Sequence, residues 1–273
     1  QVALGKEADY WLNIRPGTDA YIALAWTNIV IERRLYDDLY VKRWTNAPFL
    51  LSEDVEPSGG YVMEGGGGIH LSTRLLKESD IKEGGSYKRF MVWDSLAGTD
   101  DDHPLHQNDP TGHLTYFDAD TCEWEGETYR KPTTGFMVEQ PDRSSGTSTA
   151  WFPDPTPFDP DIDPSIYGEF EIELKDGRKT TVRPVWDLYA KRCAEYTPER
   201  ASELTGVDAQ LIEDACLEWA IRKDPRYGNG GLHFQLATDQ TGNSTHLVRM
   251  LMILSHITGN YDSNSDRRGY LSA

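Results

Sequence analysis

A chain of 273 residues, with 38% hydrophobic and 26% charged residues, is long enough for one large domain or two modest ones with a substantial core. Its 45 acidic and 27 basic residues give a formal net charge of -18, which argues against a nucleic-acid-binding role that needs clustered Lys and Arg. No apolar run reaches the roughly 20 residues of a membrane-spanning helix. The first residues show neither a leading Met nor a signal-peptide pattern, so we expect an interior piece of a longer protein.

Residues 1–50 are expected to form the first part of a dinucleotide-binding α/β domain. A short extended piece, "YWLNIRP", leads into a turn at 16–18, and a helix is predicted over about 19–33. That helix is apolar on nearly every side, which is typical of a helix inside a layered α/β fold. A second helical stretch follows at 36–44.

The region 51–166 has a different texture and is predicted to be a loop-rich insertion that lies over the core. It contains four successive glycines at 65–68, an acidic patch at 100–102 and a segment rich in Pro and Asp. Short β-strands are expected within it at 87–95, 113–118 and 133–140.

Regular structure returns in 167–226, the expected remainder of the dinucleotide-binding domain. The dipeptide Asp176-Gly177 between two alternating stretches predicts a β-hairpin. Helices are predicted at about 185–195, at 198–204 with Gly206 as the stop, and at 208–222 with Asp208 as the cap.

The segment 227–273 is expected to begin an adjoining α/β cofactor-binding domain. A buried strand is predicted at 230–237, then a polar loop, then a helix that Gly259 ends. Because strands alternate with helices, the predicted fold class is α/β, a Rossmann-like parallel sheet with flanking helices and ligand loops at the strand ends.

Two interpretations of Asp19 remain open from its spacing. As an acid at a helix N-terminus it is, like Thr18, a good capping residue, stabilised by the helix dipole and by free N–H groups. As a binding residue it would accept two hydrogen bonds from the ring N–H and exocyclic amine of a guanine edge. Gly17 would then let the backbone approach that base closely.

The loop that precedes the last predicted helix is a second candidate site. Gln240 lies there between the end of a strand and a long helix, where polar side chains converge on ligands in open α/β sheets. The alternative is an ordinary loop in which Ser244 or Thr245 caps the helix. His233 and His246 flank this loop, and either could be a core histidine.

Other motifs favour structural interpretations. The glycine run lacks the Lys and Ser/Thr of a phosphate loop. His103 and His106, beside the acidic patch and with His113 further on, match no specific metal-site spacing. Cys193 and Cys216 lie in helical patterns and are expected to be small buried hydrophobes, and with the distant Cys122 they form no zinc or iron–sulfur motif.

Three stretches together carry a resemblance to a known family. The segment "ADYWLNIRPGTDAYIALAWTNIVIERRLYDDLYVKRW" closely resembles part of the molybdopterin-dependent oxidoreductases of the dimethyl sulfoxide reductase superfamily. "YTPERASELTGVDAQLIEDACLEWA" and "STHLVRMLMILSHITGN" are similar to the same family in the same order, while the region 51–166 is largely unmatched. The segments "QTGNSTH" and "TGNYD" resemble those of the branch that contains acetylene hydratase, pyrogallol transhydroxylase and the bacterial catechol dehydroxylases.

The resemblance implies a bis-molybdopterin guanine dinucleotide cofactor with Mo or W. It places Gln240 near the pterin and metal, and Leu236 at a position where family members carry a cofactor-contacting backbone or Met. It assigns no catalytic or metal-ligating residue to this chain. An iron–sulfur cluster would belong to a region upstream of Gln1, and a cofactor-capping domain would lie beyond Ala273. The residues implied to bind the guanine end of one dinucleotide are Pro16, Gly17, Thr18 and Asp19.

Reductive dehydroxylation of a small aromatic molecule is the reaction first expected of the parent enzyme within that branch. A hydratase-like lyase and a sulfur-compound reductase are the alternatives, and an iron–sulfur electron-transfer subunit is the implied partner. A bacterial location, cytoplasmic or exported with the cofactor, stays open. The alternative of another class is an acidic, non-enzymatic module that binds a metal ion at 100–113 or 154–163.

Overall fold

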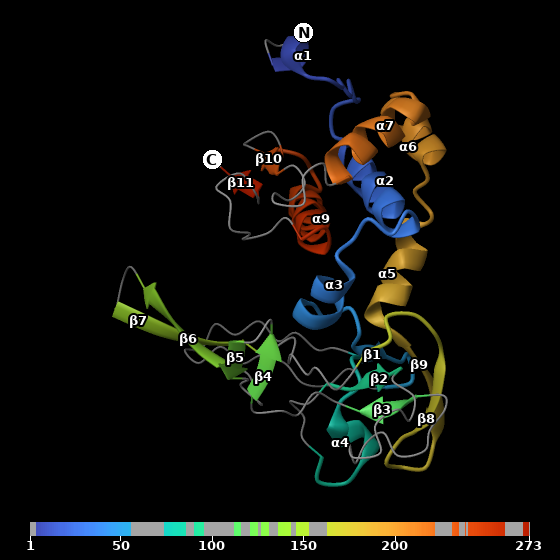
Figure 1. Ribbon diagram of the computed structural model, residues 1–273, viewed down its shortest axis with the longest axis vertical. Helices are drawn as coiled ribbons and strands as arrows, with labels where there is room; N and C mark the ends of the chain where they lie inside the picture. The colour runs from blue at the N-terminus through green and yellow to red at the C-terminus, as the bar shows by residue number, and fades with distance from the viewer. Residues whose placement is uncertain are drawn as a thin grey trace. The chain divides into compact units, whose positions relative to one another are not determined.

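The computed structural model describes residues 4–55, 74–85, 90–95, 112–115, 121–124, 127–130, 136–142, 146–152, 163–221, 231–234, 238, 240–259 and 270–272. The chain divides into two units, of which the first contains Gln1–Tyr40 and Tyr189–Ala273 and the second contains Val41–Leu188. Figure 1 labels the helices and strands of both units.

The first unit is mainly helical. Its helices are α1 (Leu4–Glu7), α2 (Asp19–Glu32), α6 (Pro198–Thr205), α7 (Ala209–Ala220) and α9 (Ser244–Ile257). Its strands are β10 (Leu232–Phe234) and β11 (Tyr270–Ser272). The boundaries between the units fall within α3 (Asp38–Trp44) and α5 (Val185–Cys193).

Helix α2 is the centre of the first unit and confirms the apolar helix predicted over 19–33. It packs against α6, α7 and α9, which surround it in Figure 1. On one side Ala25 contacts a cluster that includes Ala201 and Ile212, and on another Ala20 and Ala23 contact α9. Small alanine side chains at these contacts let the neighbouring helices approach closely, which accounts for burial around most of the helix.

The ends of α6 and α7 follow the predicted signals. The Thr197 hydroxyl accepts a hydrogen bond from the N–H of Arg200, and Gly206 ends α6 in the left-handed conformation, with φ +81°. The Asp208 carboxylate accepts a hydrogen bond from the N–H of Leu211 and caps α7. Both helices therefore begin and end close to the predicted residues.

The last predicted helix is confirmed as α9, and Gly259, at φ +68°, follows it. The expected cap is wrong in detail. Asn243 occupies the N-cap position and makes no side-chain capping hydrogen bond, while Ser244 is already the first helical residue.

The second unit contains a three-stranded antiparallel sheet with the order β1 (Leu50–Leu51), β9 (Lys179–Pro184), β8 (Phe170–Glu173). The hairpin predicted around Asp176-Gly177 is confirmed, with Gly177 at φ +80°. Side chains of this sheet and of neighbouring segments form one buried cluster: Leu50, Val55, Leu76, Met91, Ile172, Leu174 and Val182.

Shorter elements complete the second unit. They are α4 (Glu78–Ile81) and the antiparallel pairs β2 (Val92–Asp94) with β3 (His113–Thr115), β4 (Thr121–Trp124) with β5 (Glu127–Arg130), and β6 (Phe136–Asp142) with β7 (Gly146–Phe152). Strands β2, β3 and β6 confirm three of the short strands expected between residues 51 and 166.

A Rossmann-like parallel sheet does not occur among the described residues. The largest sheet there is antiparallel, because β8 and β9 are joined by a tight turn that cannot connect parallel strands. One parallel pair, β10 with β11, has α9 between its strands in the sequence and forms a β-α-β unit. The mixed α/β character is confirmed. The predicted burial of the strand at 230–237 is wrong, since Leu232 is half-buried and His233 is exposed.

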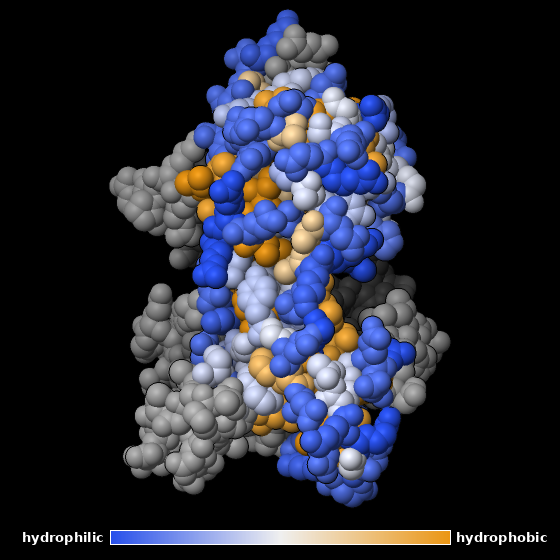
Figure 2. All heavy atoms as spheres, turned by 90° about the vertical axis from the view of Figure 1, so that its right-hand side faces the viewer, coloured by the Kyte–Doolittle hydropathy of each residue, from blue (hydrophilic) through white to orange (hydrophobic). Residues whose placement is uncertain are grey.

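Within the described part of the chain, no helix has both the length and the apolar character needed to cross a bilayer. Figure 2 shows hydrophilic side chains over much of one face, with apolar side chains gathered between them. The hydrophilic side chains on this face agree with the formal charge of -18.

Candidate functional site

The turn that precedes α2 is held closed by the carbonyl of Arg15. This oxygen accepts hydrogen bonds from the N–H of Thr18, at 3.1 Å, and from the Thr18 hydroxyl, at 2.6 Å. Pro16 in the second position and Gly17 at φ +82° in the third follow the pattern of a type II turn. A Cβ atom at Gly17 would meet no described atom within 4 Å, so the backbone there is open to a ligand.

Asp19 is the first residue of α2 and is half-exposed. The predicted capping by Thr18 or Asp19 is wrong, because Thr18 holds the N-cap position but makes no capping hydrogen bond. Its hydroxyl instead donates back to Arg15. Within the described residues the Asp19 carboxylate has no hydrogen-bond or ion-pair partner, and it lies at the positive end of the helix dipole.

The turn is anchored to the C-terminus of α6. One guanidinium nitrogen of Arg15 donates to the carbonyls of Glu203, at 3.1 Å, and Leu204, at 3.3 Å. The backbone N–H of Arg15 donates to the carbonyl of Thr205 at 3.0 Å. Two sequence motifs far apart in the chain, "IRPGTD" and "ELTGV", are therefore in direct contact.

Helices α2 and α9 run in the same direction, so their N-termini lie at the same end of the first unit. Ala20 and Ala23, near the start of α2, pack against Leu247 in the first half of α9. Just after the end of α2, the N–H of Asp37 donates to the carbonyl of Ile257, the last residue of α9, at 2.7 Å. The turn at 16–18 and the loop before α9 accordingly share one end of a parallel helix pair.

The second candidate site predicted from the sequence is the loop before α9. Gln240 is exposed in the turn that leads to α9, close in sequence to a hydrogen bond of 3.1 Å from the Thr241 hydroxyl to the carbonyl of Thr238. Leu236 lies outside the described residues. The structure thus places Gln240 at the same end of the unit as Asp19, and the role of Leu236 stays a prediction.

The two cysteines of the helical patterns are structural, as predicted. Cys193 and Cys216 are buried and free of disulfide bonds. Burial raises the pKa of the Cys193 thiol to about 11, although hydrogen bonding to Tyr189 acts in the opposite direction. Burial also raises the pKa of Cys216 well above its ordinary value. Neither thiol is therefore an activated nucleophile at neutral pH.

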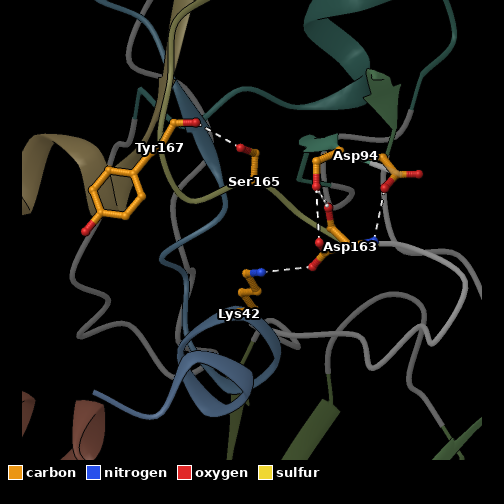
Figure 3. Close-up of polar contacts among 6 residues, drawn as sticks. Lys42, Asp94, Asp163, Ser165 and Tyr167 are labelled. Carbon is orange, nitrogen blue, oxygen red and sulfur yellow. Dashed lines mark hydrogen bonds and ion pairs between the residues drawn. The ribbon is translucent and has the colours of Figure 1, made fainter. Parts of the chain in front are cut away.

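A polar network in the second unit was not predicted from the sequence. Figure 3 shows Asp163 between Lys42 and Asp94. The Lys42 ammonium donates to Asp163 Oδ1 at 3.0 Å, and the Asp163 N–H donates to Asp94 Oδ1 at 3.0 Å. The Ser95 hydroxyl donates to the Asp163 carbonyl at 2.8 Å. The network joins α3 and β2 to the segment that leads into β8.

The remaining candidates gain no support as sites. His103, His106 and the glycine run at 65–68 lie outside the described residues. His233 and His246 are both exposed, so neither is the core histidine considered above. In the part of the chain that the structure describes, no three His, Cys, Asp or Glu side chains are grouped to hold a metal ion.

Arg15 is the residue of this region that sequence analysis missed. Its signal was present, since the arginine directly precedes the Pro-Gly turn and the motif "TG" ends a helix elsewhere. No local pattern pairs those two motifs, however, because Glu203 lies 188 positions after Arg15 in the sequence.

Comparison with known proteins gives a consistent set of relatives. No protein-family model matches the chain. It is 46% identical over 283 aligned residues to the dopamine dehydroxylase of Eggerthella lenta, an alignment that covers 97% of this chain and 27% of that protein.

Two further relatives are subunits of named reductases or dehydrogenases. The chain is 29% identical over 259 residues to the perchlorate reductase subunit alpha of Dechloromonas aromatica, covering 94% of the chain and 23% of that protein. It is 32% identical over 232 residues to the dimethylsulfide dehydrogenase subunit alpha of Rhodovulum sulfidophilum, covering 82% and 18%. The chain thus spans about a quarter or less of the length of these curated relatives.

Proposed function

We propose that this chain, which belongs to the dimethyl sulfoxide reductase superfamily of molybdopterin oxidoreductases, binds the guanine end of a molybdopterin guanine dinucleotide at the turn 16–19. One observation carries the proposal. The Asp19 carboxylate is half-exposed, has no partner among the described residues and lies directly after an open glycine turn. The helix dipole stabilises an acid at this position in either case, so it is the open turn beside the carboxylate that favours a binding role.

The chemistry of this turn fits a guanine base. The two carboxylate oxygens of Asp19 match the ring N–H and the exocyclic amine, which are adjacent donors on one edge of guanine. Adenine offers no such pair of donors. Gly17 leaves space for close approach of the base, and Thr18 keeps the turn closed through its two bonds to Arg15. Pro16 fixes one backbone angle of the turn.

The loop before α9 would contribute to the same cofactor. We place Gln240 near the pterin and metal end, and propose Leu236, from its sequence position, as a further contact with the cofactor. The parallel arrangement of α2 and α9 supports this proposal, because both helix N-termini lie at one end of the unit and favour the negative charge of a pyrophosphate. The cofactor form we propose is the bis-molybdopterin guanine dinucleotide with Mo or W.

The whole protein, on this proposal, is an oxidoreductase that removes a hydroxyl group from a small aromatic molecule. The 46% identity to a protein named dopamine dehydroxylase supports that reaction over the alternatives. An aromatic C–OH bond is replaced by C–H, while two electrons and two protons enter and water leaves. When bound, the Mo or W centre supplies the site that accepts oxygen and conducts electrons.

Two alternative reactions remain. The 32% identity to a dimethylsulfide dehydrogenase subunit supports chemistry on a sulfur compound, for which a sulfur-compound reductase is the first alternative. A hydratase-like lyase is the second alternative and rests on the sequence resemblance alone. Because the matched relatives include alpha subunits, we propose an iron–sulfur electron-transfer subunit as partner.

The test compares two variants of the protein that contains this chain, purified under anaerobic conditions. Asp19→Asn exchanges one acceptor for a donor, whereas Asp214→Asn removes a charge from a half-buried acid of α7 that bonds only Gln210 among the described residues. Guanine nucleotide released by acid is measured per folded protein. We expect Asp19→Asn to lose most of the guanine and Asp214→Asn to retain it. Equal guanine contents in the two variants would exclude Asp19 as the binding residue.

A further inference from the structure

The geometry points to Arg15 as the positioning residue of the proposed guanine site. We infer that its hydrogen bonds to the C-terminus of α6 hold the turn at 16–18, and with it Asp19, where the carboxylate receives the base. This inference rests on the proposed function of Asp19 and adds a residue that does not itself touch the base.

Arg15 satisfies most of the carbonyls at the C-terminus of α6. The last four carbonyls of a helix generally lack hydrogen-bond donors within the helix itself. The first of these accepts from the N–H of Gly206 at 2.8 Å, as the continuation of the helix. The other three accept from Arg15, two from its guanidinium and one from its backbone N–H. These four carbonyls belong to Ser202, Glu203, Leu204 and Thr205.

The second step concerns the other side of the same residue. The carbonyl of Arg15 accepts both hydrogen bonds that close the turn, from the N–H and the hydroxyl of Thr18. Only two residues separate Arg15 from Thr18, and Pro16 has a fixed φ. A displacement of Arg15 is therefore passed to the first residue of α2, which is Asp19.

The third step is the fit between Arg15 and Gly206. A Cβ atom at Gly206 would lie 3.4 Å from Arg15 Nε and 3.5 Å from Cζ. These are ordinary van der Waals distances, so the Arg15 side chain lies directly beside Gly206, and glycine is favoured there by its φ of +81°. The positive charge is also favourable at this end of the α6 dipole.

The test measures the selectivity for a guanine base, because a purely structural role would not change it. The full-length protein that contains this chain, freed of cofactor, is titrated with GMP and with AMP. The variants are Arg15→Gln and Arg15→Lys. The control is Arg33→Gln, which removes an exposed arginine whose guanidinium pairs with Glu213 at 2.6 Å, at the other end of α2.

We expect Arg15→Gln to weaken GMP binding about tenfold, as the loss of charge-assisted hydrogen bonds predicts, and to leave AMP binding unchanged. Arg15→Lys keeps the charge and one donor group, so it should restore part of the preference for GMP, and Arg33→Gln should match the wild type. If Arg15→Gln does not fold, the test rests on Arg15→Lys, for which we expect a measurable loss of GMP affinity that is smaller than tenfold.

Asp19→Asn, measured in parallel, separates the two claims. Loss of GMP preference in Asp19→Asn but in neither Arg15 variant would overturn the positioning role alone. A wild-type protein that does not distinguish GMP from AMP, or an Asp19→Asn variant equal to wild type, would overturn the proposed function together with this inference.

Discussion

The guanidinium of Arg15 donates a hydrogen bond of 3.1 Å to the carbonyl of Glu203, 188 residues further along the chain. This contact places the turn before α2 directly against the end of α6. The "RPGTD" and "ELTGV" motifs therefore form one structural feature, in which one motif carries the proposed binding residue and the other fixes its position.

Two glycines with nearly equal φ values allow an effect on stability to be distinguished from an effect on GMP binding. Gly206 and Gly177 have φ values of +81° and +80°, and alanine in this conformation costs about 1–2 kcal/mol. We expect Gly206→Ala and Gly177→Ala each to lower the free energy of unfolding by that amount, measured by urea titration. Only Gly206→Ala should also weaken GMP binding, because it strains the end of α6 whose carbonyls accept the hydrogen bonds of Arg15. Equal GMP affinities in the two variants would argue against the role of Gly206.

The contact between α2 and α9 is expected to contribute strongly to stability. Leu247 is 1% exposed and packs against Ala20 and Ala23, so Leu247→Ala should lower the free energy of unfolding by about 2–5 kcal/mol. Leu251 is half-buried on the same helix, and Leu251→Ala should cost clearly less. Denaturant titration of both variants checks this order, and a larger loss in Leu251→Ala would contradict the packing described.

In the network around Asp163, substitution of Asp94 is expected to cost more stability than substitution of Lys42. Asp94 is fully buried and accepts from the Asp163 N–H, so Asp94→Ala leaves that donor unsatisfied and should cost about 1–3 kcal/mol. Lys42 pairs with the part-exposed carboxylate of Asp163, and Lys42→Ala should cost at most about 1 kcal/mol. Urea unfolding of the two variants gives the comparison, which a costlier Lys42→Ala would refute.

Alkaline pH is expected to destabilise the folded chain in part through Cys193. Burial raises the pKa of this thiol in the folded state to about 11, while an unfolded thiol ionises near roughly 8.5. Below the pKa of the unfolded state, the protonated thiol makes its full contribution to the free energy of unfolding. That contribution is lost as the pH rises through the pKa of the folded state. The free energy of unfolding of Cys193→Ala should therefore fall less between pH 8 and pH 11 than that of the wild type. Parallel curves for the two proteins would show that the thiol does not contribute.

Local signals in the sequence predicted most helices and turns correctly. The apolar run after the Pro-Gly turn became α2, Asp176-Gly177 formed a hairpin, and Gly206 ended α6 in the left-handed conformation. These features are decided within a few neighbouring residues, by backbone preference and by the spacing of apolar side chains.

Long-range pairing was not accessible in the same way. The alternation of strands and helices suggested a parallel sheet, whereas β1 pairs antiparallel with β9 across more than half of the second unit. That partner is distant in the sequence, and no local pattern identifies it. The expected cap at Thr18 failed for a local reason, because its hydroxyl donates to the Arg15 carbonyl three residues earlier and makes no capping hydrogen bond.

The decisive measurement is the content of metal and guanine nucleotide in the full-length protein, purified anaerobically from its host. We predict Mo or W together with a guanine nucleotide released by acid, because Asp19 and the open turn before α2 are suited to that base. A folded full-length protein that contains neither the metal nor the nucleotide would contradict the account, and Asp19 would then be an ordinary acidic residue at the start of a helix.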